Sequence, residues 1–597
     1  MTTSLSAASV SDGFEEEYIR DILDELTLMP GGTPVALDTE TRDGLSVADN
    51  SAKVIGISLA FEGYSAYIAV AHESGGNVSD DTVEKLAHAL RGKLLIFANV
   101  QFDMIGLLHF GIDLRSEDFY DVPTMAFLVD ENVPRTKSLD QLGAHYCKAG
   151  KVTDPFVEKE KRSGNHLITP EQMWEYACVD AELTYRVWYK LVRTEEWQRI
   201  MAETDIWPMK QKLIRILIQM KLRGIKVDTK LTKELETLGL RRQAELREEM
   251  QFNPGSHVDN TRVFIEELGL PVLKRSEKTK RPSFDKDVME VYDGLLEQMD
   301  SPLAKLVKEY RGWNKATSAC YTPYLSLLGQ DGRLHASFNT HRTVTGRLSS
   351  SEPNLQQVPK ETDKPWNGRV KECFIAEPGY VLLSFDYSQL ELRLLADIAQ
   401  ERELLDIFND HERDIFSEMA RELNLTRDYT KRFVHQTNYG AGPAKVAKSL
   451  SISPSRAKEI RSDYKSSYPA IARIEAFCQY RVNKDGYINL WIGRRRRFQY
   501  KSQAYKAMNS MIQGGAADIV ERIMIRVWDE IDNEDECRML LQVHDALVFE
   551  VREELAEEYT KRILDVMEDV NAIVPEHVDG TFEVHFKVEA SAWAEAA

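Results

Sequence analysis

Residues 381–393 have the sequence VLLSFDYSQLELR, an apolar run that ends at Asp386 and passes directly into a second apolar pattern. Short apolar runs are typical of buried strands, and apolar residues that recur every three or four positions are typical of helices. We therefore predict a strand over 380–385 and a helix over 390–399. Asp386 is expected to be presented at the end of the strand.

A second acid occupies a similar position much later in the chain. Residues 541–550, LQVHDALVFE, set Asp545 between two strand-like runs, as at the tip of a hairpin. Two carboxylates on adjacent strands suit a pair of divalent cations, which prefer oxygen ligands. Either residue alone could equally be an ordinary turn aspartate.

Between these acids lies a stretch whose cations and rings recur at steps of four: Arg427, Lys431, His435 and Tyr439. This spacing predicts one face of a helix over 426–439, and Gly440 suits the helix C-terminus. The cations could neutralise a bound triphosphate while a base stacks near the ring of Tyr439. The alternative is a solvated amphipathic helix with a buried tyrosine.

The first 200 residues carry another group of acids. Asp38 and Glu40 close an apolar strand, and residues two apart on a strand point to the same side. Asp103 follows a strand that runs into a helix, and Tyr176 and Asp180 are four apart on a predicted helix. Four carboxylates in one cleft would repel one another unless metal ions neutralise them, so we expect phosphodiester hydrolysis with two Mg²⁺-type ions. Taken singly, Asp38 and Glu40 could be turn or cap acids.

Together these motifs resemble DNA polymerase family A with a 3′–5′ exonuclease domain of the DEDDy class, over nearly the whole chain. Further matching segments are 345–350 (TGRLSS), 353–359 (PNLQQVP), 493–497 (GRRRR) and 509–518 (NSMIQGGAAD). The resemblance implies a multidomain α/β and α+β chain, in which an RNase H-like exonuclease domain precedes a right-hand polymerase. The expected boundaries are a leader over 1–29, the exonuclease domain over 30–200, the thumb and the lead into the palm over 201–344, the first part of the palm over 345–400, the fingers over 401–499 and the second part of the palm over 500–597.

The resemblance also implies roles for individual residues, with Mg²⁺ or Mn²⁺ as cofactor, two ions per active site. The metal-binding acids would be Asp386 and Asp545 at the polymerase site, and Asp38, Glu40, Asp103 and Asp180 at the exonuclease site, where Tyr176 would orient the attacking water. The nucleotide-binding residues would be Arg427, Lys431, His435, Tyr439, Glu391 and Tyr387. The DNA-binding residues would be Arg347, Asn354, Gln356, Asn509, Gln513, His544, Arg494 and Arg495.

Glu391 has two interpretations. Residues 388–391 (SQLE) form a capping-box pattern at a helix start, whereas the resemblance implies that Glu391 excludes a ribose 2′-OH from the nucleotide pocket. Both could hold, and we favour the second. Donors from Arg347 and Gln513 could test base-pair geometry in the minor groove, where all pairs offer similar acceptors.

Three residues depart from the family pattern. His435 stands where Phe or Tyr is usual, which predicts altered selection between deoxy and dideoxy nucleotides. Ala546 stands in place of a usual Glu, so the palm should depend on Asp386 and Asp545 alone, and Tyr505 replaces a common Arg. These changes would tune rate or fidelity, or mark a weakened polymerase.

The composition of the 597 residues supports a nucleic-acid partner only locally. The net charge of −20 argues against a polyanionic partner, but residues 427–506 contain 18 Lys and Arg against 5 Asp and Glu. The six Cys show no C-x-x-C pair, which indicates reduced thiols. The absence of a long apolar run or secretory signal predicts a soluble cytoplasmic protein, in the host cytoplasm if it is phage-encoded.

We therefore expect template-directed DNA synthesis with proofreading by a monomer. The expected partners are primer–template DNA, dNTPs and a single-stranded 3′ end at the exonuclease site, with no membrane and no replisome protein indicated. Because only 37 residues precede Asp38, we expect no 5′ nuclease domain and a phage-type replicative enzyme.

Three other functions remain open at this point. An exonuclease-only repair enzyme leaves the later motifs unexplained. A single-subunit RNA polymerase shares the palm and the cationic helix but not Glu391 and the exonuclease motifs. A non-catalytic scaffold is favoured only by the three departures.

Overall fold

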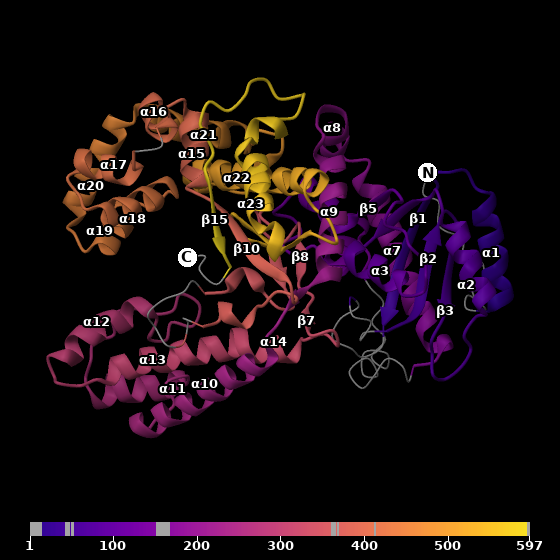
Figure 1. Ribbon diagram of the computed structural model, residues 1–597, viewed down its shortest axis with the longest axis horizontal. Coiled ribbons are helices and arrows are strands. Elements are labelled where there is room, and N and C mark those ends of the chain that lie inside the picture. Colours follow the sequence, from indigo (N-terminus) through magenta and orange to yellow (C-terminus); the bar gives the residue numbers. More distant parts are fainter. Residues whose placement is uncertain are drawn as a thin grey trace.

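The computed structural model describes residues 15–41, 48, 53–150, 168–359, 366, 369–410 and 413–593. Figure 1 shows the N-terminal unit on the right, and two helical arms that project to the left from a central sheet. The strand and helices expected around Asp386 are confirmed as β10 (Tyr380–Tyr387), α15 (Leu390–Ala399) and α18 (Arg427–Asn438).

The N-terminal unit is built on a five-stranded sheet of order β3-β2-β1-β4-β5. Its strands are β1 (Pro34–Thr41), β2 (Val54–Phe61), β3 (Tyr64–Ala69), β4 (Leu94–Phe97) and β5 (Phe119–Asp121). β2 runs antiparallel to its neighbours, and β4 runs parallel to β1 and β5. β2 is buried along its whole length, as its continuous apolar run VIGISLAF requires.

Helices cover both faces of this sheet. Alternate residues of each strand point to opposite sides, so neighbouring residues of β1 pack against different helices. Val35 and Leu37 of β1 pack with α1 (Glu16–Leu28), α2 (Asp80–Ala89) and α3 (Val100–Leu108). Ala36 packs with α4 (Val122–Val129) and α7 (Pro170–Leu191). The predicted leader therefore contains α1, whose buried apolar face belongs to the sheet's core.

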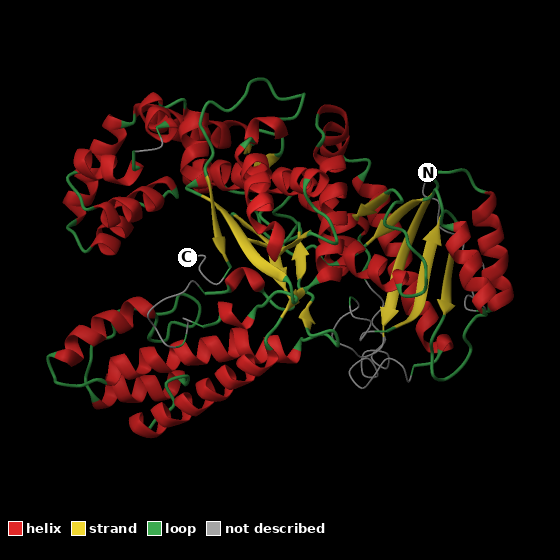
Figure 2. Ribbon diagram, viewed as in Figure 1, coloured by secondary structure: helices red, strands yellow, loops and turns green. Residues whose placement is uncertain are grey.

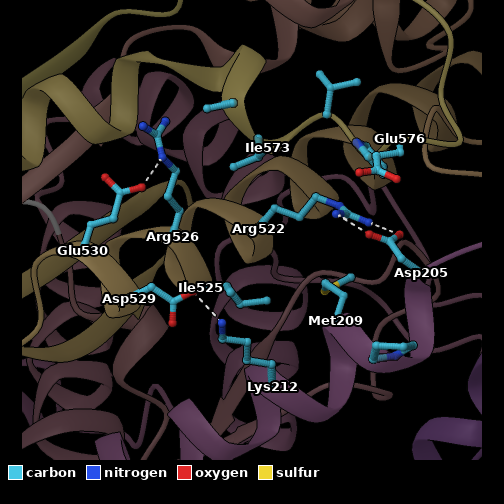
Figure 3. A pocket seen from close by; sticks show the side chains of 14 residues that line it. Asp205, Met209, Lys212, Arg522, Ile525, Arg526, Asp529, Glu530, Ile573 and Glu576 are labelled. Carbon is cyan, nitrogen blue, oxygen red and sulfur yellow. Dashed lines mark hydrogen bonds and ion pairs between the residues drawn. The ribbon is translucent and has the colours of Figure 1, made fainter.

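Two further helices, α8 (Glu195–Glu203) and α9 (Ile206–Arg223), lead from this unit towards the central sheet. α9 contacts α3 of the N-terminal unit and also α22 (Ala507–Glu530), a long helix that contacts α15 as well. A hollow of about 630 Å³ is lined by α9, α22 and residues 572–576. Figure 3 shows the ion pairs Asp205–Arg522 and Lys212–Asp529 at this hollow. α9 thus connects the two halves of the molecule.

The lower arm in Figure 1 is the predicted thumb. Its helices are α10 (Thr229–Met250), α11 (His257–Asn260), α12 (Lys286–Glu297), α13 (Leu303–Ala316) and α14 (Thr322–Ser326). Its core is apolar and aromatic, and includes Leu246, Phe264, Tyr292 and Trp313. Short strand pairs at its base join β6 (Ile225–Lys226) to β7 (Arg333–Leu334), and β8 (Ser337–Asn339) to β9 (Ser349–Ser351).

The central sheet has the order β13-β14-β10-β15 and is antiparallel throughout. Figure 2 shows it apart from the N-terminal sheet, with helices packed against it. Its other strands are β13 (Cys537–Val543), β14 (Ala546–Arg552) and β15 (Val588–Ala592), and α23 (Ala556–Glu568) packs beside α22.

The upper arm, the predicted fingers, contains α18 and five further helices: α16 (Arg402–Asn409), α17 (Ile415–Leu423), α19 (Pro443–Leu450), α20 (Pro454–Ser467) and α21 (Pro469–Asp485). The ribbon β11 (Tyr487–Asn489) and β12 (Arg495–Arg497) follows α21.

All six cysteines are free thiols, as predicted. Within the described residues, no helix is both long and apolar enough to cross a membrane.

Candidate active sites

Three of the four predicted exonuclease acids meet at one end of the N-terminal sheet. Strand alternation puts Asp38 and Glu40 on the same face of β1 as Ala36, which is the face that α7 covers. Asp180 lies on α7, and ligand oxygens of the three acids are all within 4.8 Å of one another. Such close carboxylates repel one another strongly, so the cluster fits a divalent cation.

Asp103 approaches this cluster from α3 and is held by Thr39. β1 pairs with β4 only as far as Leu37, and the next free N–H on that side, from Thr39, donates to Asp103 Oδ1 at 3.0 Å. The Thr39 hydroxyl donates to the same oxygen at 2.7 Å. Burial raises the pKa of Asp103 to about 7, against the effect of these hydrogen bonds. Its Oδ2 is buried and accepts no hydrogen bond from the described residues, so it remains available as a cation ligand.

Tyr176 lies on α7 one turn before Asp180, as its spacing predicts. The ring is half-buried against a core that includes Ile55 and Tyr67. The structure therefore puts the phenol on the helix that carries one of the clustered acids.

The acids predicted for the polymerase site, Asp386 and Asp545, lie at one end of the central sheet. In the pairing of β10 with β14, Asp386 is opposite Ala546, the residue that follows Asp545. β13 and β14 pair up to Val543 and Ala546, so His544 and Asp545 form a two-residue turn, with His544 at a φ of 58°. The predicted hairpin is confirmed, and its register makes Asp386 and the turn neighbours.

Arg347 links this hairpin to α15 and α18. Its Nη2 donates to Asp545 Oδ1 at 3.3 Å and to Glu391 Oε1. The Tyr439 hydroxyl donates to the other Glu391 oxygen. Burial raises the pKa of Glu391, and the charge of Arg347 acts to lower it. Burial and the neighbouring Glu391 raise the pKa of Tyr439. Four predicted site residues from distant parts of the sequence thus form one network.

The capping-box interpretation of Glu391 is wrong. α15 begins at Leu390, and its cap residue Gln389 has a φ of 58° with no side-chain capping hydrogen bond. The carboxylate instead faces Arg347 and Tyr439. The carboxylate bonds to residues from distant segments instead of capping its own helix. A helix cap contributes only about 1 kcal/mol of stability, whereas a buried carboxylate needs strong or charged hydrogen-bond donors.

The cationic face of α18 already has an acidic partner in this structure. Arg427 donates to both oxygens of Asp414 at 2.9 Å, and this contact lowers the pKa of Asp414. The charges of Arg427 and Lys431 each lie 5.9 Å from the Phe416 ring. His435 is half-buried between the rings of Phe416 and Tyr439, at 5.8 and 6.1 Å. A triphosphate at this face would have to replace the Asp414 carboxylate.

Among the predicted DNA-binding residues, Gln356 contacts a strand of the hairpin. Gln356 donates to Gln542 Oε1 at 2.6 Å, and Gln542 donates to the His544 carbonyl. Asn509 and Gln513 lie four apart on α22, both half-buried. Asn354 is exposed and caps the short helix Leu355–Gln357. Gln542, which the motifs did not single out, joins two of the predicted contacts.

The family models agree with both units. Residues 225–594 match the model of DNA polymerase family A, which is more than half of the chain, and residues 12–195 match the model of a 3′-5′ exonuclease. The chain belongs to DNA polymerase family A. Its central sheet and two arms are therefore a family A polymerase domain, preceded by an exonuclease domain.

The related proteins are bacterial DNA polymerases I. The chain is 30% identical to that of Pseudomonas aeruginosa and 28% identical to that of Rhizobium leguminosarum, matching 94% and 91% of its own length. It spans only 63% and 57% of those two relatives. The fold is similar to that of a solved structure described as the POL domain of Pol1 from M. smegmatis in complex with DNA primer-template and dNTP, with a TM-score of 0.79, 24% identity, and coverage of 98% of this chain and 99% of that chain.

Two predicted contacts of the family A polymerase domain need correction, beginning with Arg494. Arg494 is 3% exposed and donates to Asp518 on α22 and to the carbonyl of Thr345, so it is a structural residue rather than a DNA contact. The Tyr387 ring is 4% exposed, and its hydroxyl donates to the Met567 carbonyl. Only the main chain of Tyr387 is left for a nucleotide contact.

The remaining arginines of the GRRRR segment bind the exonuclease domain. Arg495 donates to Glu196 at 2.7 Å, and Arg496 and Arg497 donate to Glu131 at 2.7 and 3.1 Å. The predicted DNA contact of Arg495 is therefore replaced, in this structure, by an ion pair between domains. Nothing in the local sequence around Glu131 or Glu196 marks them as partners, because the pairs span about 300 residues or more.

Replacing His435 with phenylalanine is expected to change the ratio of dideoxy to deoxy nucleotide incorporation several-fold, because the ring loses its polar nitrogens where the sugar is expected. Burial, with the nearby charge of Lys431, lowers the pKa of His435 from its ordinary value of 6.5. The imidazole is therefore neutral above that pH, and the unmutated ratio should be constant from about pH 7 to 8.5. Single-turnover incorporation measures the ratio in the variant and the pH dependence of the ratio in the unmutated chain. An unchanged ratio in His435→Phe contradicts the prediction.

Proposed function

We propose that this chain copies a primed DNA template from dNTPs and removes mispaired 3′ ends by 3′–5′ exonucleolysis. The observation that carries the proposal is the register that makes Asp386 a neighbour of the Asp545 hairpin, joined through Arg347 and Glu391 to Tyr439 at the end of the cationic helix. The second carboxylate cluster, around Asp38, supports the exonuclease activity.

Each site has residues suited to divalent cations. Asp386 and Asp545 would hold them at the polymerase site, and Asp38, Glu40, Asp180 and Asp103 at the exonuclease site, as Mg²⁺ or Mn²⁺, two per site. When bound, such ions neutralise phosphate charge and lower the pKa of the attacking oxygen.

The chain's own residues would position the nucleotide. Arg427 and Lys431 would bind the triphosphate, with Arg427 exchanging the Asp414 carboxylate for phosphate oxygens. Glu391, held by Arg347 and Tyr439, would leave no room for a ribose 2′-OH. The ring of Tyr439, 39% exposed, would lie beside the templating base. Arg347 and Gln513 would donate to the minor-groove acceptors of the primer-terminal pair.

At the exonuclease site, Tyr176 would orient the attacking water towards the terminal phosphodiester. Thr39 fixes Asp103 through two hydrogen bonds, so this acid keeps its place when DNA arrives. A frayed single-stranded 3′ end is the expected substrate.

The proposed partners are primer–template DNA and dNTPs, which the M. smegmatis protein binds in its solved structure. The proposal includes action as a monomer in the cytoplasm, in phage or similar DNA replication.

Incubation of the unmutated chain with a labelled primer–template and Mg²⁺ tests the proposal. With dNTPs, template-directed extension is expected, and without them, shortening from the 3′ end. Shortening alone would indicate an exonuclease-only enzyme, and preferred use of rNTPs an RNA polymerase. DNA binding without either reaction would indicate a scaffold and refute the proposal.

Mg²⁺ is expected to stabilise the exonuclease domain against unfolding, because it relieves the repulsion among Asp38, Glu40 and Asp180. An ion present at 100 times its Kd contributes about 2.7 kcal/mol. Asp180→Asn should therefore be more stable than the unmutated protein in EDTA and gain less from Mg²⁺. Thermal unfolding with and without Mg²⁺ measures both effects. Glu175→Gln, at an exposed position of the same helix, is the control, and an identical Mg²⁺ response in the Asp180 variant contradicts the prediction.

A further inference from the structure

A small cavity of about 10 Å³ lies directly against the hairpin that carries Asp545. Its polar wall comprises Arg347, Glu521, Gln542, His544 and Asp545, and the rest of the wall is aliphatic. Three of these residues belong to the predicted polymerase site. Glu521, from α22, belongs to no motif and has no role in the proposed reaction.

Two polar atoms of the residues that line this cavity lack hydrogen-bond partners. Within the described part of the chain, the buried Nε of Arg347 has no acceptor, and the buried Oε1 of Glu521 has no donor. A buried polar group without a partner costs about 1–3 kcal/mol. One atom is a donor and the other an acceptor, and about 10–15 Å³ is the volume that one water molecule needs.

The other oxygen of Glu521 is firmly held. It accepts from Lys210 Nζ on α9, and the two side chains are 2% and 1% exposed. On either side of Lys210, Asp205 pairs with Arg522 and Lys212 pairs with Asp529, as Figure 3 shows. α9 and α22 are therefore locked together around Glu521, and the orientation of its carboxylate is restricted.

We propose that one ordered water occupies this cavity, accepts a hydrogen bond from Arg347 Nε and donates one to Glu521 Oε1. Its second hydrogen can bond to an oxygen of Asp545 or Gln542 at the same wall. The Lys210–Glu521 pair thereby becomes a positioning element that fixes Arg347, and through it Asp545 and Glu391, from the helix that leads out of the exonuclease domain. The predicted effect on nucleotide incorporation rests on the proposed function, whereas the water site itself does not.

A matched pair of double variants tests this role. Lys210→Met/Glu521→Gln and Lys210→Met/Glu521→Met both remove the two buried charges at similar volume, but only the first keeps an oxygen in position to meet the water. We expect the Gln variant to retain at least about one third of the unmutated kcat, and the Met variant to lose about 10- to 100-fold, since small displacements at a reacting centre have effects of this size. The KM for dNTP, the primer–template Kd and the Tm should be alike in both variants.

Equal kcat values in the two variants would overturn the positioning role. A high-resolution crystal structure of the unmutated protein tests the water separately: density between Arg347 Nε and Glu521 Oε1 supports the site, and its absence refutes it. Degradation of single-stranded DNA reports that both variants are folded. If the unmutated chain incorporates no nucleotide, the proposed function fails, and the crystal structure still decides the water site.

Discussion

Asp386→Ala is expected to incorporate dNTPs at least about 10³-fold more slowly than the unmutated chain, because one of the two acids proposed to hold the metal ions is lost. On β14 the residue opposite Asp386 is Ala546, which carries no carboxylate, while Glu589 stands opposite it on β15. Asp386 is exposed at the end of β10, and its replacement should leave the Tm within about 1 °C. Primer extension under single-turnover conditions measures the loss.

Asp38→Ala is the matched control on the other sheet. It should degrade single-stranded DNA at least about 10²-fold more slowly and extend primers at the unmutated rate. Asp386→Ala should show the reverse pattern. If one substitution abolishes both activities, the two carboxylate sites are not independent, and the assignment of separate reactions to them is wrong.

Lys210→Met is expected to lower the free energy of unfolding by about 3–5 kcal/mol, because it leaves Glu521 as a buried carboxylate without its cation. Burial already raises the pKa of Glu521. The charged form is therefore disfavoured in the folded state, so the loss should be largest at neutral pH and shrink as the pH falls and Glu521 becomes protonated. Chemical denaturation over a pH series measures the effect.

Lys212→Met, two residues along the same helix, provides the comparison. The side chains of Lys212 and Asp529, which form an ion pair, are 46% and 44% exposed. Loss of this pair should therefore lower the free energy of unfolding by no more than about 1 kcal/mol. The double variant Lys210→Met/Glu521→Met should recover most of the loss of the single variant, since no unpaired charge remains. Equal losses at positions 210 and 212 would contradict the prediction.

Local patterns predicted the elements of both sites. Asp38 and Glu40 lie two apart on a strand and share a face in the structure, because strand alternation is a property of the backbone. The same holds for the four-residue spacing on α18 and for the hairpin around Asp545. These features depend on neighbours within about ten residues, which the sequence displays directly.

Contacts over long distances were predicted less well. Arg494 and Arg495 were expected at DNA because their segment is strongly basic, yet Asp518 and Glu196 accept their hydrogen bonds. Arg427 was expected to be available to a triphosphate and pairs with Asp414, which caps the preceding helix. An arginine's partner is whichever carboxylate the fold brings near it, and no spacing rule contains that information.

By itself the sequence determined which residue types stand at the ends of strands and along helix faces, and hence the two groups of acids and the cationic helix. Only the tertiary structure decided that Asp103 is held by Thr39, that Glu391 faces Arg347 and Tyr439 rather than its own helix start, and that Glu521 lies behind Asp545. The reason is physical: hydrogen-bond periodicity is local, whereas burial and charge pairing depend on which distant segments pack together.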